Sequence, residues 1–122
     1  MPTTLPISVY MITLNEQDNI GHALDRMERF DEIIIVDSGS TDRTLEIARR
    51  YPNVTIHHND WPGFSEQKAH ALSLCRNDWV LNVDADEILS DQYIAEIERF
   101  MQADEFDGLE SSRLLLRWGK RP

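Results

Sequence analysis

The sequence predicts an α/β fold, in which a mostly parallel sheet carries helices on both faces. Three observations lead to this prediction. Short apolar, β-branched runs alternate with segments whose apolar residues recur at helical spacing. The apolar runs are nearly continuous, as in strands that are covered on both faces. Polar residues follow several runs directly, which is typical of parallel strands with their carboxyl ends at one edge.

The first half of the chain supplies two strand–helix pairs. Residues 7–14 are β-branched and apolar, which predicts a buried strand, and residues 32–37 form the clearest strand. A helix follows each strand. Their apolar positions are Ile20, Ala23, Leu24 and Met27 in the first helix, and Leu45 and Ala48 in the second. Gly39 permits a tight turn before the second helix, which Ser40 or Thr41 can cap.

The second half continues the alternation. Residues 53–58 form a short strand, residues 65–75 a helix, and residues 79–83 a further buried strand. The remaining predictions are a helix capped by Ser90 and Asp91 that runs through Met101, an extended segment at 106–118 that suggests a fifth strand, and a turn or linker at 119–122.

Length and composition indicate a single domain, residues 1–122, with a substantial core. Apolar residues make up 41% and charged residues 28%, so the chain is expected to fold. The formal net charge of −10 repels nucleic acid, and we expect no nucleic-acid partner. Cys75 is the only cysteine, which fits a reducing compartment. We see no signal peptide at the start, and no run approaches the roughly 20 apolar residues of a membrane span.

Polar side chains lie at the ends of three predicted strands. Thr13, Asn15 and Glu16 lie at the end of the first, Asp37 ends the second, and Asp84 follows the fourth. Open α/β sheets bind ligands at the edge where the carboxyl ends of their strands meet. We therefore expect these groups to line one ligand pocket, although the residues after the first strand could form only a strand end and a cap.

Asp84-Ala85-Asp86 is an Asp-x-Asp segment directly after a buried strand. Side chains at positions i and i+2 of an extended backbone lie on the same face, so both carboxylates can face one ion. Oxygen ligands of this kind suit Mg²⁺ or Mn²⁺, which commonly bridge to phosphates. We predict that Asp84 and Asp86 bind a metal–diphosphate group; the alternative is a pair of solvated loop acids.

The segment Asp37-Ser38-Gly39-Ser40-Thr41-Asp42 admits two interpretations. In one, Asp37 accepts a hydrogen bond from a base N–H or a ribose hydroxyl, and the following residues shape the turn. In the other, the segment only caps a helix and its acids lie at the surface. The chain has neither a Gly-x-Gly-x-x-Gly loop nor a Gly-Lys-Ser/Thr phosphate loop, which disfavours the usual dinucleotide fold.

Four further groups of side chains have weaker functional interpretations. Lys68 could neutralise a phosphate or could be a solvated helix lysine. His57 and His58 lack further ligands at metal-site spacing and fit exposed strand-end residues better. Trp61, with Phe64, fits packing of a loop better than sugar binding. The basic residues near the end indicate a surface face or the first part of a larger structure; they are Arg113, Arg117, Lys120 and Arg121.

Three segments together resemble one known family. They read Ile-Ser-Val-Tyr-Met-Ile-Thr-Leu-Asn-Glu at 7–16, Ile-Ile-Ile-Val-Asp-Ser-Gly-Ser-Thr-Asp-Arg-Thr at 33–44 and Asn-Val-Asp-Ala-Asp-Glu at 82–87. Their order and spacing resemble the family 2 glycosyltransferases with the GT-A fold. Gly63-Phe64-Ser65-x-x-Lys68 is similar to a segment of bacterial lipopolysaccharide core glucosyltransferases of the β-1,4 type. The motifs are specific as a set and weak one by one.

The resemblance implies a Rossmann-like fold of the GT-A type, ending here after about five strands. It also implies an inverting transfer from a nucleotide-diphospho-sugar, usually UDP-linked, to a saccharide or lipid-linked saccharide acceptor, with Mg²⁺ or Mn²⁺ on the Asp-x-Asp. Asn15 and Glu16 would then line the nucleotide pocket, and Asp37 would contact uridine. Asp84 and Asp86 would hold ribose, metal and diphosphate. Lipopolysaccharide synthesis and a cytoplasmic location at the bacterial inner membrane rest on the resemblance alone.

In that family the acceptor-binding half and the catalytic base follow the part present here. The resemblance therefore implies the N-terminal, donor-binding part of a longer glycosyltransferase, with the base outside this chain and little turnover by the chain alone. Glu87 is a carboxylate in the right neighbourhood, but no motif marks it as the base. An exposed sheet edge could pair with a second copy, which makes a homo-oligomer a further hypothesis.

Three other functions stay open at this point. A non-catalytic nucleotide- or divalent-ion-binding module would use the same residues without transfer. A phospho-acceptor receiver domain would need its acid pair after the first strand, where Asn15 and Glu16 stand. A two-carboxylate glycosidase shows no signature, because that chemistry depends on the separation of the carboxyl groups.

Overall fold

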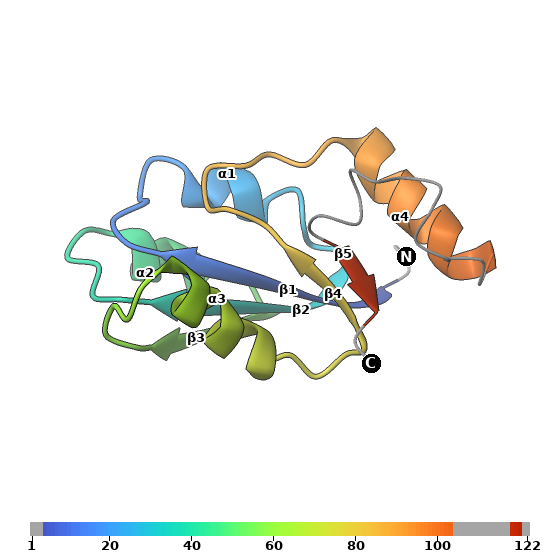
Figure 1. Cartoon of the computed structure of the whole chain (residues 1–122). Helices are drawn as coiled ribbons and strands as arrows, with labels where there is room; N and C mark the ends of the chain where they lie inside the picture. Colours follow the sequence, from blue (N-terminus) through green and yellow to red (C-terminus); the bar gives the residue numbers. More distant parts are fainter. Residues whose placement is uncertain (1–3, 104–117, 121–122) are drawn as a thin grey trace.

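The computed structural model describes residues 4–103 and 118–120, which form a five-stranded sheet and four helices. The strands are β1 (Leu5–Thr13), β2 (Phe30–Asp37), β3 (Val54–His58), β4 (Trp79–Asn82) and β5 (Trp118–Lys120). The helices are α1 (Ile20–Leu24), α2 (Thr44–Ala48), α3 (Phe64–Ser73) and α4 (Asp91–Ala103). The predicted α/β fold is confirmed (Figure 1).

The sheet has the strand order β3-β2-β1-β4-β5. β1 pairs in parallel with β2 and with β4, and β2 pairs in parallel with β3. Among the described strands only β5 is antiparallel, and it pairs with β4. The chain moves outward from β1 to β3 and then returns to the other side of β1. The order of the strands therefore reverses between β1 and β4, where doubly wound sheets form their ligand crevice.

Two apolar layers hold the helices on the sheet, because side chains alternate between its faces. Ile33 and Ile35 of β2 belong to the larger layer, which includes residues of α1, α2 and α4. Ile34 and Val36 belong to the smaller layer with α3. Full burial of such a side chain contributes about 1.5–3 kcal/mol, and a slip of one residue would exchange the layers. The register that aligns the ends of β1 and β2 is therefore strongly fixed.

Two predicted helix starts behave differently in the structure. The prediction that Ser40 or Thr41 caps α2 is wrong, because the helix begins at Thr44 and its N–H donates to Asp42 Oδ1 at 2.9 Å. The predicted cap of α4 is confirmed, since the N–H of Tyr93 donates to Ser90 Oγ at 3.0 Å. Asp42 lies one residue before the helical cap position, a shift that spacing alone does not reveal.

The chain end also differs from its prediction. Residues 119 and 120 belong to β5, so the predicted turn or linker at 119–122 is wrong for these two residues. The predicted strand at 106–118 lies outside the described residues except for its last position. Within the described part of the chain, no helix combines the length and apolar composition required to span a lipid bilayer.

Candidate functional site

The carboxyl ends of three strands are aligned at one edge of the sheet. Thr13 of β1 is paired with Asp37 of β2, which is paired with His58 of β3. Figure 1 shows the loops that follow these strands gathered on the left side of the molecule. β4 lies on the other side of β1 and ends at Asn82, with Asp84 two residues later. The polar strand ends predicted from the sequence are thus brought to one edge.

Asp37 is buried at this edge and accepts four hydrogen bonds from its own chain. The N–H groups of Gly39 and Ser40 donate to Oδ1, at 2.8 and 2.7 Å. The hydroxyls of Thr13 and Ser40 donate to Oδ2, at 2.7 and 2.5 Å. Burial raises the pKa of Asp37, but the hydrogen bonds from Ser40, Thr13 and Gly39 outweigh it and hold the pKa below its usual range.

These four donors occupy the acceptor positions of the Asp37 carboxylate. A contact from Asp37 to a base N–H or a ribose hydroxyl would therefore have to replace one of them. Gly39 has a φ of 121°, a backbone conformation open to glycine, which fits the predicted tight turn. The hydroxyl of Ser38 is buried and has no hydrogen-bond partner among the described residues.

The loops after β1 and β2 are joined by reciprocal hydrogen bonds. We call residues 14–17 the first loop and residues 38–44 the second loop. N–H groups of the first loop donate to side chains of the second: Asn15 to Ser40 Oγ (2.8 Å), Glu16 to Thr44 Oγ1 (2.7 Å) and Gln17 to Asp42 Oδ2 (3.2 Å). In return, the N–H groups of Thr41 and Arg43 donate to Asn15 Oδ1 (2.8 Å) and Gln17 Oε1 (3.0 Å).

This pairing limits what the second loop can bind. The N–H groups at positions 39, 40, 41, 43 and 44 each have a side-chain acceptor within the chain. A phosphate-binding loop needs such N–H groups to be free to point at the anion. The second loop therefore does not act as a phosphate cradle, and a diphosphate would have to bind elsewhere on the edge.

A cavity of about 450 Å³ lies beside the first loop. It is lined by Ile12, Thr13, Leu14, Glu16, Trp61 and Phe64. Three of these are large apolar side chains with exposed fractions of 51% for Leu14, 49% for Trp61 and 70% for Phe64. Trp61 and Phe64 meet edge to face, with ring centroids 4.8 Å apart. This ring contact fits the predicted packing of the loop, and both rings also keep exposed surface beside the cavity.

The segment that carries Trp61 and Phe64 is held by hydrogen bonds between Asn59 and Gln67. Gln67 is fully buried on α3, and its Nε2 donates to the carbonyl oxygen of Asn59 at 3.0 Å. Asn59 Nδ2 donates back to Gln67 Oε1 at 2.8 Å. These two bonds between buried Gln67 and half-buried Asn59 fix the start of the loop against the helix. The backbone next to the exposed rings of Trp61 and Phe64 is therefore fixed on α3.

Asp84 and Asp86 are exposed on a tight turn, with the buried side chain of Ala85 between them. The N–H of Asp84 donates to Glu87 Oε1 at 2.9 Å, and the N–H of Glu87 donates to the carbonyl oxygen of Asp84 at 3.0 Å. Glu87 thus shapes the turn, and burial of Ala85 leaves only its backbone for a ligand. Two hard oxygen donors on one turn fit Mg²⁺ or Mn²⁺ with positions left for phosphate and water.

Lys68, His57 and His58, which the sequence also marks as candidates, lie near the same edge. Lys68 is partly exposed on α3, one turn after Phe64 and on the same face by helical spacing. His58 is exposed, with Nε2 2.9 Å from Asp60 Oδ1. Nowhere among the described residues do three or more metal-ligating side chains cluster. The histidine pair therefore does not extend to a metal site within that part of the chain.

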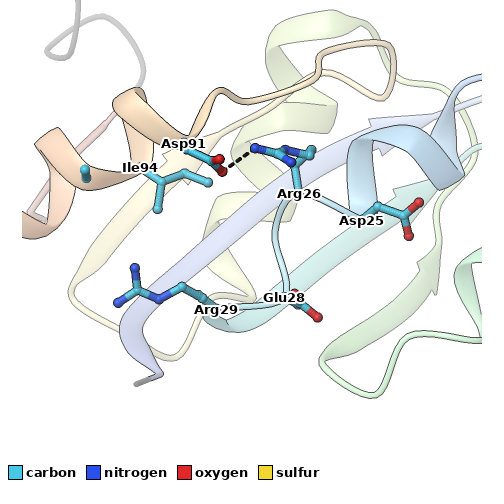
Figure 2. Close-up of a pocket in the computed structure, with 7 residues that line it drawn as sticks. Asp25, Arg26, Glu28, Arg29, Asp91 and Ile94 are labelled. Carbon is cyan, nitrogen blue, oxygen red and sulfur yellow. Dashed lines mark hydrogen bonds and ion pairs between the residues drawn. The ribbon is translucent and has the colours of Figure 1, made fainter. Parts of the chain in front are cut away.

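A second cavity, of about 260 Å³, lies between the α1–β2 turn and α4 (Figure 2). Arg26 points toward Asp91 and forms an ion pair with it, and its Nε donates to the carbonyl oxygen of Leu89 at 3.1 Å. Arg29 donates to both carboxylate oxygens of Glu98 on α4, at 3.3 and 2.9 Å. The two guanidinium groups therefore tie α4 to the body of the protein.

Comparison with known proteins decides the family. Residues 8–115 match the family profile described as Glycosyl transferase family 2. The chain is a member of this family. The relationship predicted from the strand-end motifs is confirmed, and so is the GT-A type of fold.

Individual proteins that resemble this chain agree with this assignment. The lipopolysaccharide core biosynthesis glycosyltransferase LpsC of Rhizobium meliloti is 36% identical over 126 residues, which cover 97% of this chain and 46% of LpsC. The structure of S. aureus TarS 1–349 with UDP has a TM-score of 0.70 and 25% identity, over 81% of this chain and 32% of TarS. Glucosyl-3-phosphoglycerate synthase from Mycobacterium tuberculosis, with Mn²⁺, UDP and glucosyl-3-phosphoglycerate, has a TM-score of 0.57 and 28% identity, over 65% of this chain and 33% of the synthase. The chain spans less than half the length of each of these proteins.

Proposed function

We propose that residues 1–122 act as the donor-binding domain of an inverting hexosyltransferase that uses a UDP-sugar in lipopolysaccharide core or cell-envelope polysaccharide synthesis. The observation that carries the proposal is the shared edge, where Thr13 and Asp37 are in register and Asp84 follows the neighbouring strand. The name of LpsC supports the pathway, and the complexes of TarS and of the synthase with UDP support the nucleotide.

The donor would lie across the strand ends, with its nucleoside at β1 and β2 and its diphosphate toward β4. Two strand spacings, about 10 Å, separate β2 from β4, a span on the scale of a nucleoside diphosphate. Thr13, Leu14, Glu16 and Trp61 would line the nucleoside cavity, while Asp37 and the turn after it would contact the donor beside this cavity. The residues of that turn assigned to the donor are Ser38 and Gly39.

The diphosphate would bind where the chain offers unpaired oxygen ligands and a cation. Asp84 and Asp86 would hold Mg²⁺ or Mn²⁺, which when bound offsets the negative charge that develops on the departing diphosphate. The backbone at Ala85 would lie against the donor. Lys68 would neutralise a further phosphate oxygen from α3. The second loop, with its N–H groups already bonded, would take no part in phosphate binding.

The reaction would be a single displacement at the anomeric carbon. An acceptor hydroxyl oxygen forms the new glycosidic bond, the bond from that carbon to the phosphate oxygen breaks, and its electron pair leaves with the nucleoside diphosphate. The proton of the acceptor passes to a carboxylate base. We expect this base outside residues 1–122, since no motif marks Glu87 for the role and its carboxylate already accepts the N–H of Asp84.

Thermal unfolding with UDP, GDP and ADP, each with and without Mn²⁺, tests the proposal. A ligand at about 100 times its Kd adds roughly 2.7 kcal/mol of stability. We expect a shift with UDP that requires Mn²⁺, and Asp86→Ala should remove the metal requirement or the shift itself. Asp78→Ala, an exposed acid just before β4, is the matched control. A metal-dependent shift that survives in Asp86→Ala would place the ion elsewhere, and no shift with any nucleotide would refute donor binding.

A further inference from the structure

Thr44 is the last residue of segment 33–44, which resembles the glycosyltransferase family, but it does not line the cavity. Its side chain is fully buried at the start of α2, so a ligand in the cavity cannot touch it. Its hydroxyl accepts the N–H of Glu16 at 2.7 Å and donates to Asp42 Oδ1. Asp42 Oδ2 in turn accepts the N–H of Gln17. Two consecutive N–H groups of the first loop are thus held by side chains of the second loop.

The first loop, whose N–H groups are bound in this way, forms one wall of the cavity. Leu14 and Glu16 both line the cavity, and Asn15 between them has a φ of 54°. This left-handed conformation is unfavourable for most residues and tolerable for asparagine, so surrounding bonds have to maintain it. The carbonyl oxygen of Glu16 also accepts the N–H groups of Asn19 and Ile20, at 3.0 and 2.9 Å. The loop is therefore fixed from both sides around Glu16.

We propose that Thr44 and Asp42 are positioning residues for the donor: they hold the first loop in the shape that makes Leu14 and Glu16 a preformed wall of the nucleoside cavity. This inference rests on the proposed function. Because neither residue needs to contact the donor, any effect on nucleotide binding must pass through the backbone at Glu16 and Gln17. A preformed wall lowers the ordering cost of binding, so its loss should weaken affinity.

Thr44→Val is the decisive variant, since it keeps the shape of the side chain and removes only the hydroxyl. Thr44→Ser restores the hydroxyl, and Thr4→Val makes the same chemical change at an exposed position before β1. Two quantities are measured for each variant of the 122-residue chain: the Kd of UDP with Mn²⁺ by calorimetry, and the exchange rate of the Glu16 amide proton by NMR. Asp42→Ala, at a partly exposed residue, provides a second test that leaves the core intact.

We expect Thr44→Val to raise the Kd of UDP about tenfold and to speed exchange at Glu16, while Thr44→Ser stays near wild type and Thr4→Val is unchanged. Asp42→Ala should act in the same direction, with faster exchange at Gln17. Faster exchange with an unaltered Kd would overturn the positioning role and leave a purely structural one. Unaltered exchange would overturn the loop attachment itself. A wild-type chain that binds no nucleotide would instead refute the proposed function, which the exchange rates do not depend on.

Discussion

At the scale of single residues, the carboxylate of Asp37 joins the ends of β1 and β2. It accepts the hydroxyl of Thr13, its register partner, and the donors of the turn that follows. Hydrogen bonds to a charged group contribute about 1.5–3 kcal/mol each in favourable cases, more than neutral ones. A residue that looks like a ligand in the sequence therefore also determines the geometry of the edge.

The depressed pKa of Asp37 makes its contribution to stability dependent on pH. Since the folded-state pKa lies below the unfolded value of about 3.9, the ionised group stabilises the fold above that value. The contribution disappears as the pH falls through the folded-state pKa. We predict that Asp37→Asn lowers the free energy of unfolding by about 2 kcal/mol at neutral pH, and that the difference from wild type shrinks below about pH 4. Urea unfolding at a series of pH values measures both effects.

Asp78→Asn is a suitable comparison for this series. Asp78 is exposed in the turn before β4, at the opposite edge of the sheet. Its substitution should change stability by less than about 0.5 kcal/mol at every pH, as is usual for surface sites. An Asp37→Asn variant whose deficit stays constant from neutral to acidic pH would contradict the role assigned to the ionised carboxylate.

At the scale of secondary-structure elements, a buried glutamate fixes the amino ends of the central strands. Glu32 of β2 accepts the hydroxyl of Ser8 on β1 at 2.5 Å. It also accepts the backbone N–H and the Nε of Arg76, both at 2.8 Å, from the connection between α3 and β4. Asn77 donates to the same Ser8 hydroxyl through its N–H and Nδ2. β1, β2 and the start of β4 are thereby joined opposite the ligand edge.

Removal of the Glu32 side chain should be costly, because it leaves buried donors without an acceptor. We predict that Glu32→Ala lowers the free energy of unfolding by about 3 kcal/mol. Arg76→Ala should cost only about 1 kcal/mol, because the Arg76 side chain is 70% exposed and its N–H still reaches Glu32. The double variant should cost less than the sum of the two. Chemical denaturation supplies all three values, and additive costs would show that the two groups are not coupled.

At the scale of the whole molecule, sequence patterns identify the elements that depend on local periodicity. The apolar runs predict all four parallel strands, and the polar residues at their ends predict which edge carries Thr13, Asp37 and Asp84. Such features repeat along one segment, so a single sequence contains them. The family resemblance adds the Asp-x-Asp role, which still awaits the binding experiment.

Other features depend on segments that meet only in the folded chain. The hydrogen bonds of Thr44 with Glu16 and of Asp42 with Gln17 join residues that are 28 and 25 positions apart. No local sequence pattern therefore predicts them. The hydrogen bonds between Asn59 and Gln67 join a loop to a helix, and in the sequence both residues look like ordinary polar positions. The strand at 118–120 depends on its partner β4, because a short segment of Trp, Gly and Lys has little strand preference of its own.

The outer edge of the sheet gives a last prediction for the whole molecule. β3 pairs with β2 on one side, and no strand of the described residues lies on its other side. Such an edge can add a strand from a second copy, which is the oligomer hypothesis drawn from the sequence. We predict concentration-dependent dimers by light scattering, and about a tenfold higher dimer dissociation constant for Thr55→Lys, a charge at an exposed position of β3.

The effect of Thr55→Lys on net charge alone would strengthen dimers. Weaker dimers in this variant would therefore point to the edge strand and not to bulk electrostatics. The chain carries a formal net charge of −10, so an added lysine reduces self-repulsion and should favour association in general. Ser73→Lys, at the exposed end of α3, makes the same charge change away from the edge and should leave dimers intact or strengthen them. Weaker association in Thr55→Lys alone locates the interface at β3. A wild-type chain that stays monomeric over a wide concentration range, or equal weakening by both lysines, would rule out pairing through this edge.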